Sequence, residues 1–176
     1  MYQILLVDDE NITLEALKTG MDWEKHKITR VYTTRDTEEA KQILSANAID
    51  FAICDIEMPN ETGFDLVKWI NACSPLTLCM FLTCHSEFTY AKQAIQLGAL
   101  DYILKPVDYD ELSEVLQKAI QKKKEMMQSQ WARSVITDIR KDIVENNAQA
   151  PEHAAQFIND AKSYILENIG NEELDC

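Results

Sequence analysis

Carboxylates, a hydroxyl and an ammonium each stand directly after a short apolar run of this sequence. They are Asp8 and Asp9 after residues 4–7, Asp55 after 51–54, Thr83 after 78–82 and Lys105 after 102–104. If the four runs are parallel strands, their carboxyl ends meet at one edge of a sheet, where open α/β sheets place their chemistry. Clustered carboxylates repel one another unless a positive group offsets them. A divalent cation with oxygen ligands does so, and Mg2+ is the natural choice.

Each of these residues also has an ordinary structural explanation. Asp8 and Asp9 could cap the helix that follows them, Asp55 could cap a loop, Thr83 could close a strand end, and Lys105 could be a solvated surface charge. Any one explanation is adequate for an isolated residue. Separate structural roles explain the set poorly, because the four strand ends would bring these charged groups together at one edge of the sheet.

The elements that must position these residues alternate along the chain. Apolar runs at 4–7, 51–54, 78–82 and 102–104, with a more polar run at 29–32, predict five strands, each followed by an amphipathic helix. Such alternation predicts an α/β fold, a doubly wound five-stranded parallel sheet of the flavodoxin-like order 2-1-3-4-5. The polar second strand is expected at an edge. The four glycines form no Gly-rich loop after the first strand, which argues against a dinucleotide site.

Local signals place the helix ends and their apolar stripes. Asp36 with Glu39, and Asp108 with Glu111, predict capping boxes, and Gly63 is expected where a tight backbone turn is needed. Two predicted stripes are listed here: Ile12, Leu14 and Leu17 in a helix ending near Gly20, and Phe88, Ala91, Ala94, Ile95 and Leu97 in a helix ended by Gly98.

Composition limits the classes of function. The 176 residues are 46% hydrophobic and 27% charged, with a net charge of −13. So acidic a chain is not expected to bind nucleic acid by itself, because phosphate binding needs a basic face. The apolar runs are too short to span a membrane, and charges follow the first of them, so we expect neither a span nor export, but a cytoplasmic protein. The five cysteines are expected to be reduced and structural.

Four motifs together resemble the receiver domain of two-component response regulators. They are Val7-Asp8-Asp9-Glu10, then Asp55-Ile56-Glu57-Met58-Pro59 with Gly63 and Leu66, then Leu82-Thr83, and Asp101-Tyr102-Ile103-Leu104-Lys105-Pro106. The resemblance covers residues 1 to about 122. The order and spacing of the four motifs make the resemblance specific, whereas one motif alone would be weak evidence. Cys84 departs from the family, which usually has a smaller residue there, and this puts the rate of phosphate loss in doubt.

The resemblance implies a role for each site residue. Asp55 is the implied phosphoacceptor, which takes a phosphoryl group from a phosphohistidine of a sensor histidine kinase. The implied Mg2+ ligands are Asp9, Asp55 and the backbone carbonyl of Glu57, with Asp8 acting mainly through water. Lys105 is expected to neutralise phosphoryl oxygens, with Thr83 and Tyr102 as the switch pair. A cis Lys105–Pro106 bond is also implied.

The chain beyond residue 121 carries a second set of patterns. Residues 121–146 continue a helix in which Ala132, Ile136, Ile139 and Ile143 form a short coiled-coil seam. The seam predicts a homodimer, although folding back onto the receiver is the competing interpretation. Phe157–Cys176 resembles the first helix of an AraC-type DNA-binding domain. The expected organisation is a receiver at 1–121, a helical linker at 122–155, and the start of a truncated output domain at 156–176.

Three classes of function follow from these patterns. The favoured one is a phosphorylation-activated transcription regulator, which binds DNA through a domain mostly absent from this chain. The alternative is an interaction module that regulates a protein partner without DNA. A phosphatase with an aspartyl nucleophile comes third, because Glu57 could be its second acid, but Mg2+ and Lys105 are better explained by a receiver. We therefore expect a phosphoacceptor that promotes its own phosphorylation and slow autodephosphorylation, rather than a turnover enzyme.

Overall fold

The computed structural model describes the backbone of residues 1–84 and 88–145, and side chains as far as Thr137, except that of Phe88. Strands and helices alternate throughout this part of the chain. The strands are β1 (Tyr2–Val7), β2 (Ile28–Thr34), β3 (Phe51–Asp55), β4 (Leu78–Thr83) and β5 (Asp101–Leu104). The helices are α1 (Asn11–Gly20), α2 (Thr37–Ala46), α3 (Gly63–Cys73), α4 (Phe88–Gln96) and α5 (Tyr109–Glu145).

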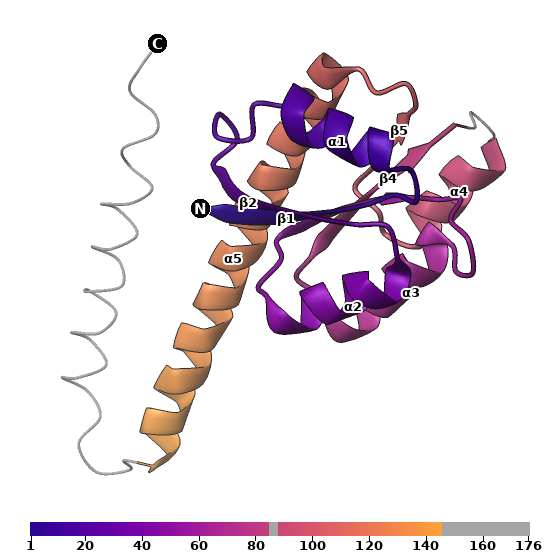
Figure 1. Cartoon of the computed structure of the whole chain (residues 1–176). Coiled ribbons are helices and arrows are strands. Elements are labelled where there is room, and N and C mark those ends of the chain that lie inside the picture. Colours follow the sequence, from indigo (N-terminus) through magenta and orange to yellow (C-terminus); the bar gives the residue numbers. More distant parts are fainter. Residues whose placement is uncertain (85–87, 146–176) are drawn as a thin grey trace. The chain divides into compact units, whose positions relative to one another are not determined.

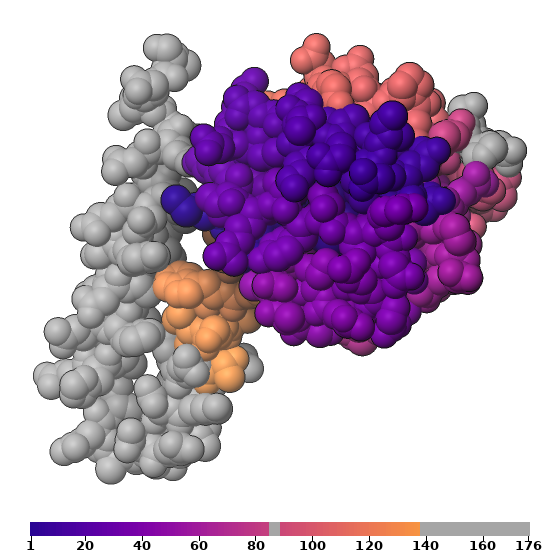
Figure 2. Space-filling view, viewed as in Figure 1, coloured from indigo at the N-terminus to yellow at the C-terminus, as the bar shows by residue number. Residues whose placement is uncertain are grey.

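The five strands form one parallel sheet in the order β2-β1-β3-β4-β5. This confirms the predicted fold class and strand order. Figure 1 shows α2 and α3 on the opposite side of the sheet from α1. Figure 2 is a space-filling view from the same direction. Side chains from the first half of the chain, coloured indigo to purple, form much of the surface that faces the viewer.

Burial along the strands follows from their positions in the sheet. Every residue of β3 and β4 is buried, as expected for strands covered on both faces. β2 is an edge strand in which only the first and last residues, Ile28 and Thr34, are buried. The largest fully buried side chains include Phe51 of β3 and Phe81 of the neighbouring strand β4.

Both predicted N-cap residues, Asp36 and Asp108, accept hydrogen bonds from the helices that follow them. Asp36 accepts hydrogen bonds from the backbone N–H groups of Glu38 and Glu39 at the start of α2. The Glu39 carboxylate does not return a bond to Asp36, because it accepts the hydroxyl of Thr34 instead. Asp108 accepts from the N–H groups of Asp110 and Glu111, where α5 begins.

Two residues assigned to apolar stripes lie on the wrong face of their helices. Ile12 of α1 is 79% exposed, while Leu14 and Leu17 are buried. Ile12 and Leu14 are two residues apart, about 200° around a helix, and so cannot share a face. Ile95 of α4 is 77% exposed. The core is contacted instead by Tyr90 and Ala94 of α4 and by Leu97 directly after it, at spacings of four and three.

Helix α5 continues without a break through residues 109–145, as the sequence predicted. Its first half packs on the sheet through Leu112, Val115, Leu116 and Ala119. Residues Met1–Lys124 form one compact unit, and the chain from Glu125 belongs to a second. Among the described residues, no helix is both long and apolar enough to cross a membrane.

The predicted seam is only partly described. Ala132 is exposed, and Ile136 is 52% exposed. The side chains of Ile139 and Ile143, the break near Pro151 and the AraC-like segment 157–176 lie outside the described residues. The structure therefore leaves the dimer a prediction.

Candidate functional site

Three carboxylates meet at the carboxyl ends of β1 and β3. One carboxylate oxygen from each of Asp8, Asp9 and Asp55 lies within 4.8 Å of the others. Asp8 and Asp55 are buried, and Asp9 is half-buried. β1 and β3 are neighbours in the sheet, with Val7 opposite Cys54, so the residues that follow these two positions emerge side by side. The strand ends thus assemble the cluster that the sequence predicted.

Lys105 brings a positive charge into this cluster. Its Nζ lies 2.7 Å from Oδ2 of Asp8 and 3.1 Å from Oδ2 of Asp55. The lysine follows the edge strand β5, and its backbone N–H donates to the carbonyl of Thr83 at 2.8 Å. The Lys105–Pro106 peptide bond is cis, which confirms that prediction.

The directions of the pKa shifts show that Asp8, Asp55 and Lys105 interact with one another. Burial raises the pKa of Asp8 and of Asp55, and repulsion from a neighbouring carboxylate adds to each rise, although Lys105 opposes it. Burial acts to lower the pKa of Lys105, but its two carboxylate partners outweigh burial, and the pKa is raised. Lys105 therefore stays charged, while the carboxylates remain short of positive charge.

These residues fit a hard divalent cation. Three carboxylates face one ammonium, so the cluster carries excess negative charge when all are ionised. Oδ2 of Asp8 is buried, and among the described residues its charge is offset by one contact, the ion pair with Lys105 at 2.7 Å. Closely spaced carboxylate oxygens with a charge deficit are the ligands that Mg2+ takes. Asp8, Asp9 and Asp55 could hold such an ion.

Gly63 lets helix α3 begin against the backbone of Asp55. A Cβ on Gly63 would lie 2.0 Å from the carbonyl oxygen of Asp55 and 3.2 Å from Cα of Ile56. Gly63 also donates its N–H to the carbonyl of Ile56. The turn in the loop is made earlier, by Asn60 with a φ of 72°. Gly63 is thus required for close approach, rather than for the tight turn that the sequence suggested.

The proposed switch residues lie on adjacent strands. Thr83 is buried at the end of β4, opposite Leu104 of β5, and Tyr102 lies opposite Phe81. Because side chains two residues apart share a face, Thr83 and Tyr102 belong to the same face of the sheet. The Tyr102 side chain is half-buried against the core on that face.

The side chain of Glu57 is engaged by a residue that the sequence did not single out. The Tyr90 hydroxyl, in the first turn of α4, donates to Oε1 of Glu57 at 3.2 Å. Glu57 is exposed in the loop between β3 and α3. Helix α4 is thus tied to the loop that follows Asp55.

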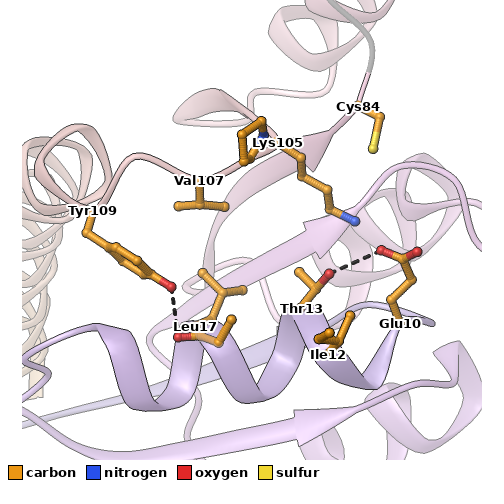
Figure 3. Close-up of a pocket in the computed structure, with 10 residues that line it drawn as sticks. Glu10, Ile12, Thr13, Leu17, Cys84, Lys105, Val107 and Tyr109 are labelled. Atoms are coloured by element: carbon orange, nitrogen blue, oxygen red, sulfur yellow. Dashed lines mark hydrogen bonds between the residues drawn. The ribbon is translucent and has the colours of Figure 1, made fainter.

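An open groove of about 470 Å³ runs beside Lys105, between α1 and the loop from β5 to α5. In Figure 3 the Lys105 side chain enters this groove between Cys84 and the start of α1, where Glu10 and Thr13 lie. The wall formed by α1 includes the exposed Ile12, and the opposite wall includes Val107 and the ring of Tyr109. The Tyr109 hydroxyl donates to the carbonyl of Ala16, which joins the two walls. The groove gives an apolar approach to the charged cluster.

The sequence contained a signal for part of what was missed. Counting 100° per residue places Ile12 away from the buried face of α1 and Tyr90 on the same face of α4 as Ala94. The bond from Tyr90 to Glu57 had no such signal, because it joins two elements whose packing only the fold determines.

Comparison with known proteins gives the same assignment as the geometry. The response regulator receiver domain family matches residues 4–117 of this chain. An uncharacterized response regulatory protein of Staphylococcus epidermidis is 35% identical over 122 residues, which are 69% of this chain and 48% of the relative. The transcriptional regulatory protein HptR of Staphylococcus aureus is 34% identical over 137 residues, 77% of this chain and 52% of HptR. The chain thus spans about half the length of these curated relatives.

Solved structures agree with the strand order. The receiver domain of AraT, a response regulator from Geobacillus stearothermophilus, has a TM-score of 0.65 and 32% identity, covering 73% of this chain and 98% of that one. A two-component transcriptional regulator AraC from Clostridium phytofermentans has a TM-score of 0.64 and 28% identity, covering 74% and 99%.

Proposed function

Because the chain belongs to the response regulator receiver family over residues 4–117, we propose that it is the phosphorylation-activated switch of a two-component system. Asp55 accepts a phosphoryl group from the phosphohistidine of a partner sensor kinase. One observation supports this most strongly: Lys105 Nζ lies 3.1 Å from Asp55 and 2.7 Å from Asp8, within a cluster of three carboxylates. A nucleophile, an acidic cation site and a fixed ammonium are what phosphoryl transfer needs.

Asp55 acts as the nucleophile through a carboxylate oxygen. The bond from phosphorus to the donor nitrogen breaks as the bond from phosphorus to Asp55 forms, and the kinase histidine leaves. Lys105 offsets the charge of the phosphoryl oxygens as a compact point charge on the buried side of the site. Its two ion pairs already hold the ammonium in place, so little reorganisation is needed when the phosphoryl group arrives.

Mg2+ is the proposed cofactor of this step. Asp9, Asp55 and the backbone carbonyl of Glu57 would hold the ion directly, and Asp8 mainly through water. When bound, Mg2+ supplies the positive charge that the phosphoryl oxygens and the three carboxylates require. Asp8 and Asp9 then act by holding charge, and neither exchanges a proton with the phosphoryl group.

Thr83 and Tyr102 transmit the phosphorylated state to the outer face. The Thr83 hydroxyl donates to a phosphoryl oxygen, and Tyr102 moves inward as Thr83 is drawn toward it. Their placement on one face of neighbouring strands supports this pairing. Tyr102 lies on β5, directly before the loop into α5, so its movement can alter the helix that leads out of the receiver.

The groove beside Lys105 is where we place the histidine-bearing segment of the kinase. Its walls are largely apolar, it opens to solvent, and it leads to the ammonium that faces Asp55. Ile12 is exposed on α1 at this position. An exposed aliphatic side chain beside a reactive site is a natural contact for an amphipathic helix.

The output is proposed to be transcriptional control by a homodimer. Relatives such as HptR are named transcriptional regulatory proteins, and this chain spans about half of their length. DNA binding would then depend on a domain beyond the described residues, which agrees with the net charge of −13. Pairing of α5 through Ala132, Ile136, Ile139 and Ile143 would bring two output domains side by side. Regulation of a protein partner without DNA is the second candidate.

A small phosphodonor tests the proposed function without the kinase. Intact-mass measurement after incubation with acetyl phosphate and Mg2+ should show one added phosphoryl group on the wild-type chain. Asp55→Asn, or chelation of Mg2+ with EDTA, should leave the mass unchanged. The group should remain on the protein and be lost slowly, since the chain is not a turnover enzyme. A wild-type chain that gains no phosphoryl group would overturn the proposal.

A further inference from the structure

The side chain of Arg35 is bonded to the backbone of a residue in the carboxylate cluster. Its Nε donates to the carbonyl oxygen of Asp9 at 2.7 Å. Arg35 directly follows β2, whereas Asp9 lies in the loop between β1 and α1. Among the described residues, no other donor reaches this carbonyl. The bond therefore joins two loops at the edge of the sheet where the carboxylates meet.

This bond continues the pairing of β1 with β2 beyond the ends of both strands. Val7 lies opposite Thr34 at the last position of the ladder, and the N–H of Asp8 donates to the Thr34 carbonyl at 3.2 Å. The next contact along the ladder is made by a side chain, from Arg35 to Asp9. Because the N–H of Asp8 and the carbonyl of Asp9 are both tied to the end of β2, the backbone that carries the Asp9 carboxylate has few alternative conformations.

Local bonds also fix the backbone of Arg35 itself. The N–H of Asp36 donates to the hydroxyl oxygen of Thr34 at 3.2 Å, which closes a tight turn around Arg35. Thr34 is buried at the end of β2, and Asp36 caps α2. The arginine thus stands between a buried strand end and a capped helix, and its side chain reaches Asp9 from a fixed point.

The position of Asp9 matters because it is the least buried member of the cluster. One of its carboxylate oxygens lies within 4.8 Å of oxygens of Asp8 and Asp55, although Asp9 is only half-buried. Repulsion between the carboxylates favours an Asp9 side chain that turns away from the other two, and a fixed backbone limits that movement. Contacts that orient a metal ligand before the ion arrives raise the affinity for the metal.

We propose that Arg35 is a positioning residue that holds the backbone of Asp9 and so raises the affinity of the carboxylate cluster for Mg2+. This rests on the proposed function, in which Asp9 is a ligand of Mg2+. The hydrogen bond and the charge of Arg35 act in opposite directions. A positive charge beside a cation site repels Mg2+, whereas the bond to Asp9 favours its binding. Substitutions that separate the bond from the charge therefore test the proposal.

Arg35→Gln and Arg35→Met separate these two effects, because both remove the charge and only one removes the donor. The amide nitrogen of glutamine stands as many bonds from Cα as Nε of arginine and can donate to Asp9. Methionine has a similar length and no donor. Arg35→Met should bind Mg2+ about two- to fivefold more weakly than Arg35→Gln, which is the effect of one hydrogen bond. Arg35→Gln should bind Mg2+ at least as tightly as wild type, since it loses only the repulsion.

Isothermal titration calorimetry with Mg2+ alone, without a phosphodonor, measures these affinities. Thermal unfolding in EDTA reports the stability of each variant separately. Arg30→Met is the matched control, because Arg30 is exposed in the first half of the same strand and its guanidinium also makes a bond, to the Tyr32 hydroxyl at 3.5 Å. It should bind Mg2+ with the affinity of wild type.

A purely structural role for Arg35 predicts that Arg35→Met unfolds at a lower temperature in EDTA but binds Mg2+ as Arg35→Gln does. That result would overturn the inference and leave the proposed function of Asp55 intact. Tighter binding of Mg2+ by both variants, to the same extent, would also overturn it, because the charge would then be the whole effect. A wild-type chain that binds no Mg2+ would overturn the proposed cofactor, and this inference with it.

Discussion

Lys123 Nζ lies 3.1 Å from Oδ1 of Asp50, at the edge of the sheet opposite to Asp55. The same ammonium donates to the carbonyl of Leu76 at 2.7 Å, and the other oxygen of Asp50 accepts the N–H of Gln3. Only 6% of Lys123 is exposed. These contacts join α5 to β1 and to the segments just before β3 and β4, at the point where the helix leaves the first compact unit.

We expect Lys123→Met to destabilise the receiver by about 2–3 kcal/mol, because it leaves the Asp50 carboxylate without its partner at a largely buried site. Lys122→Met is the matched control, since Lys122 is exposed at the preceding position of the same helix. It should change the free energy of unfolding by no more than about 0.5 kcal/mol. Urea unfolding at pH 7 measures both. Equal effects of the two substitutions on the free energy of unfolding would show that the ion pair between Lys123 and Asp50 does not stabilise the fold.

Gly63→Ala should damage the site as well as the fold. The new Cβ would meet the Asp55 carbonyl at 2.0 Å, and backbone on both sides must shift to admit it. We expect a loss of about 2 kcal/mol or more, together with slower phosphorylation by acetyl phosphate. Gly98→Ala is the comparison, since Gly98 has a φ of 72° but open space around its Cβ position. It should lower stability without slowing phosphorylation. A normal phosphorylation rate in Gly63→Ala would contradict this account.

Asp55→Asn should raise stability at pH 7 in EDTA, by on the order of 1 kcal/mol. Burial and Asp8 raise the pKa of Asp55 above its ordinary value of 3.8, so the ionised form costs free energy in the folded state. That cost is complete above the raised pKa, and it disappears as the pH falls below the ordinary value, where the carboxyl is protonated in both states. Lys105 keeps its partner Asp8 in the variant.

Thermal unfolding across this pH range, with and without Mg2+, checks the sign. The advantage of Asp55→Asn should fade toward low pH. It should also fade on addition of Mg2+, which stabilises wild type by binding to the ionised cluster. An advantage that grows as the pH falls would mean that the Asp55 charge stabilises the fold.

The helix seam predicts self-association that charge can disrupt. Ile136→Asp or Ile139→Asp should shift a dimer, or a dimer that forms on phosphorylation, to monomer. Thr137→Asp is the matched control, because it adds the same charge next to the seam, at an exposed residue. Sedimentation velocity with and without acetyl phosphate measures the shift. A wild-type chain that stays monomeric at high concentration in both states would eliminate the seam as an interface.

Much of this structure was predictable from the sequence because the decisive patterns are local. Apolar runs ending on Asp8, Asp55, Thr83 and Lys105 fixed the strands, and parallel pairing brings their ends to one edge. Helix faces were less certain, because Ile12 and Ile95 are apolar yet exposed, and only packing shows which side of a helix is covered. A helix stripe is therefore a weaker prediction than a buried strand.

Contacts between distant parts of the chain could not be predicted in the same way. Lys123 stands in a run of three lysines that looks like a solvated face, and its burial depends on Asp50 from a different element. The requirement for glycine at position 63 comes from the approach of α3 to β3, rather than from the turn itself. Such contacts depend on the relative placement of elements, which a local pattern does not contain.

The position of the phosphoryl group tests the central claim most directly. Wild-type chain treated with acetyl phosphate and Mg2+ can be reduced with borohydride, which converts an aspartyl phosphate to homoserine, and its peptides can then be sequenced by mass spectrometry. We predict homoserine at position 55 and at no other aspartate, with none in a sample treated in EDTA. Homoserine at Asp8 or Asp9, or a phosphorylated chain without homoserine at position 55, would contradict the assignment of Asp55 as the phosphoacceptor.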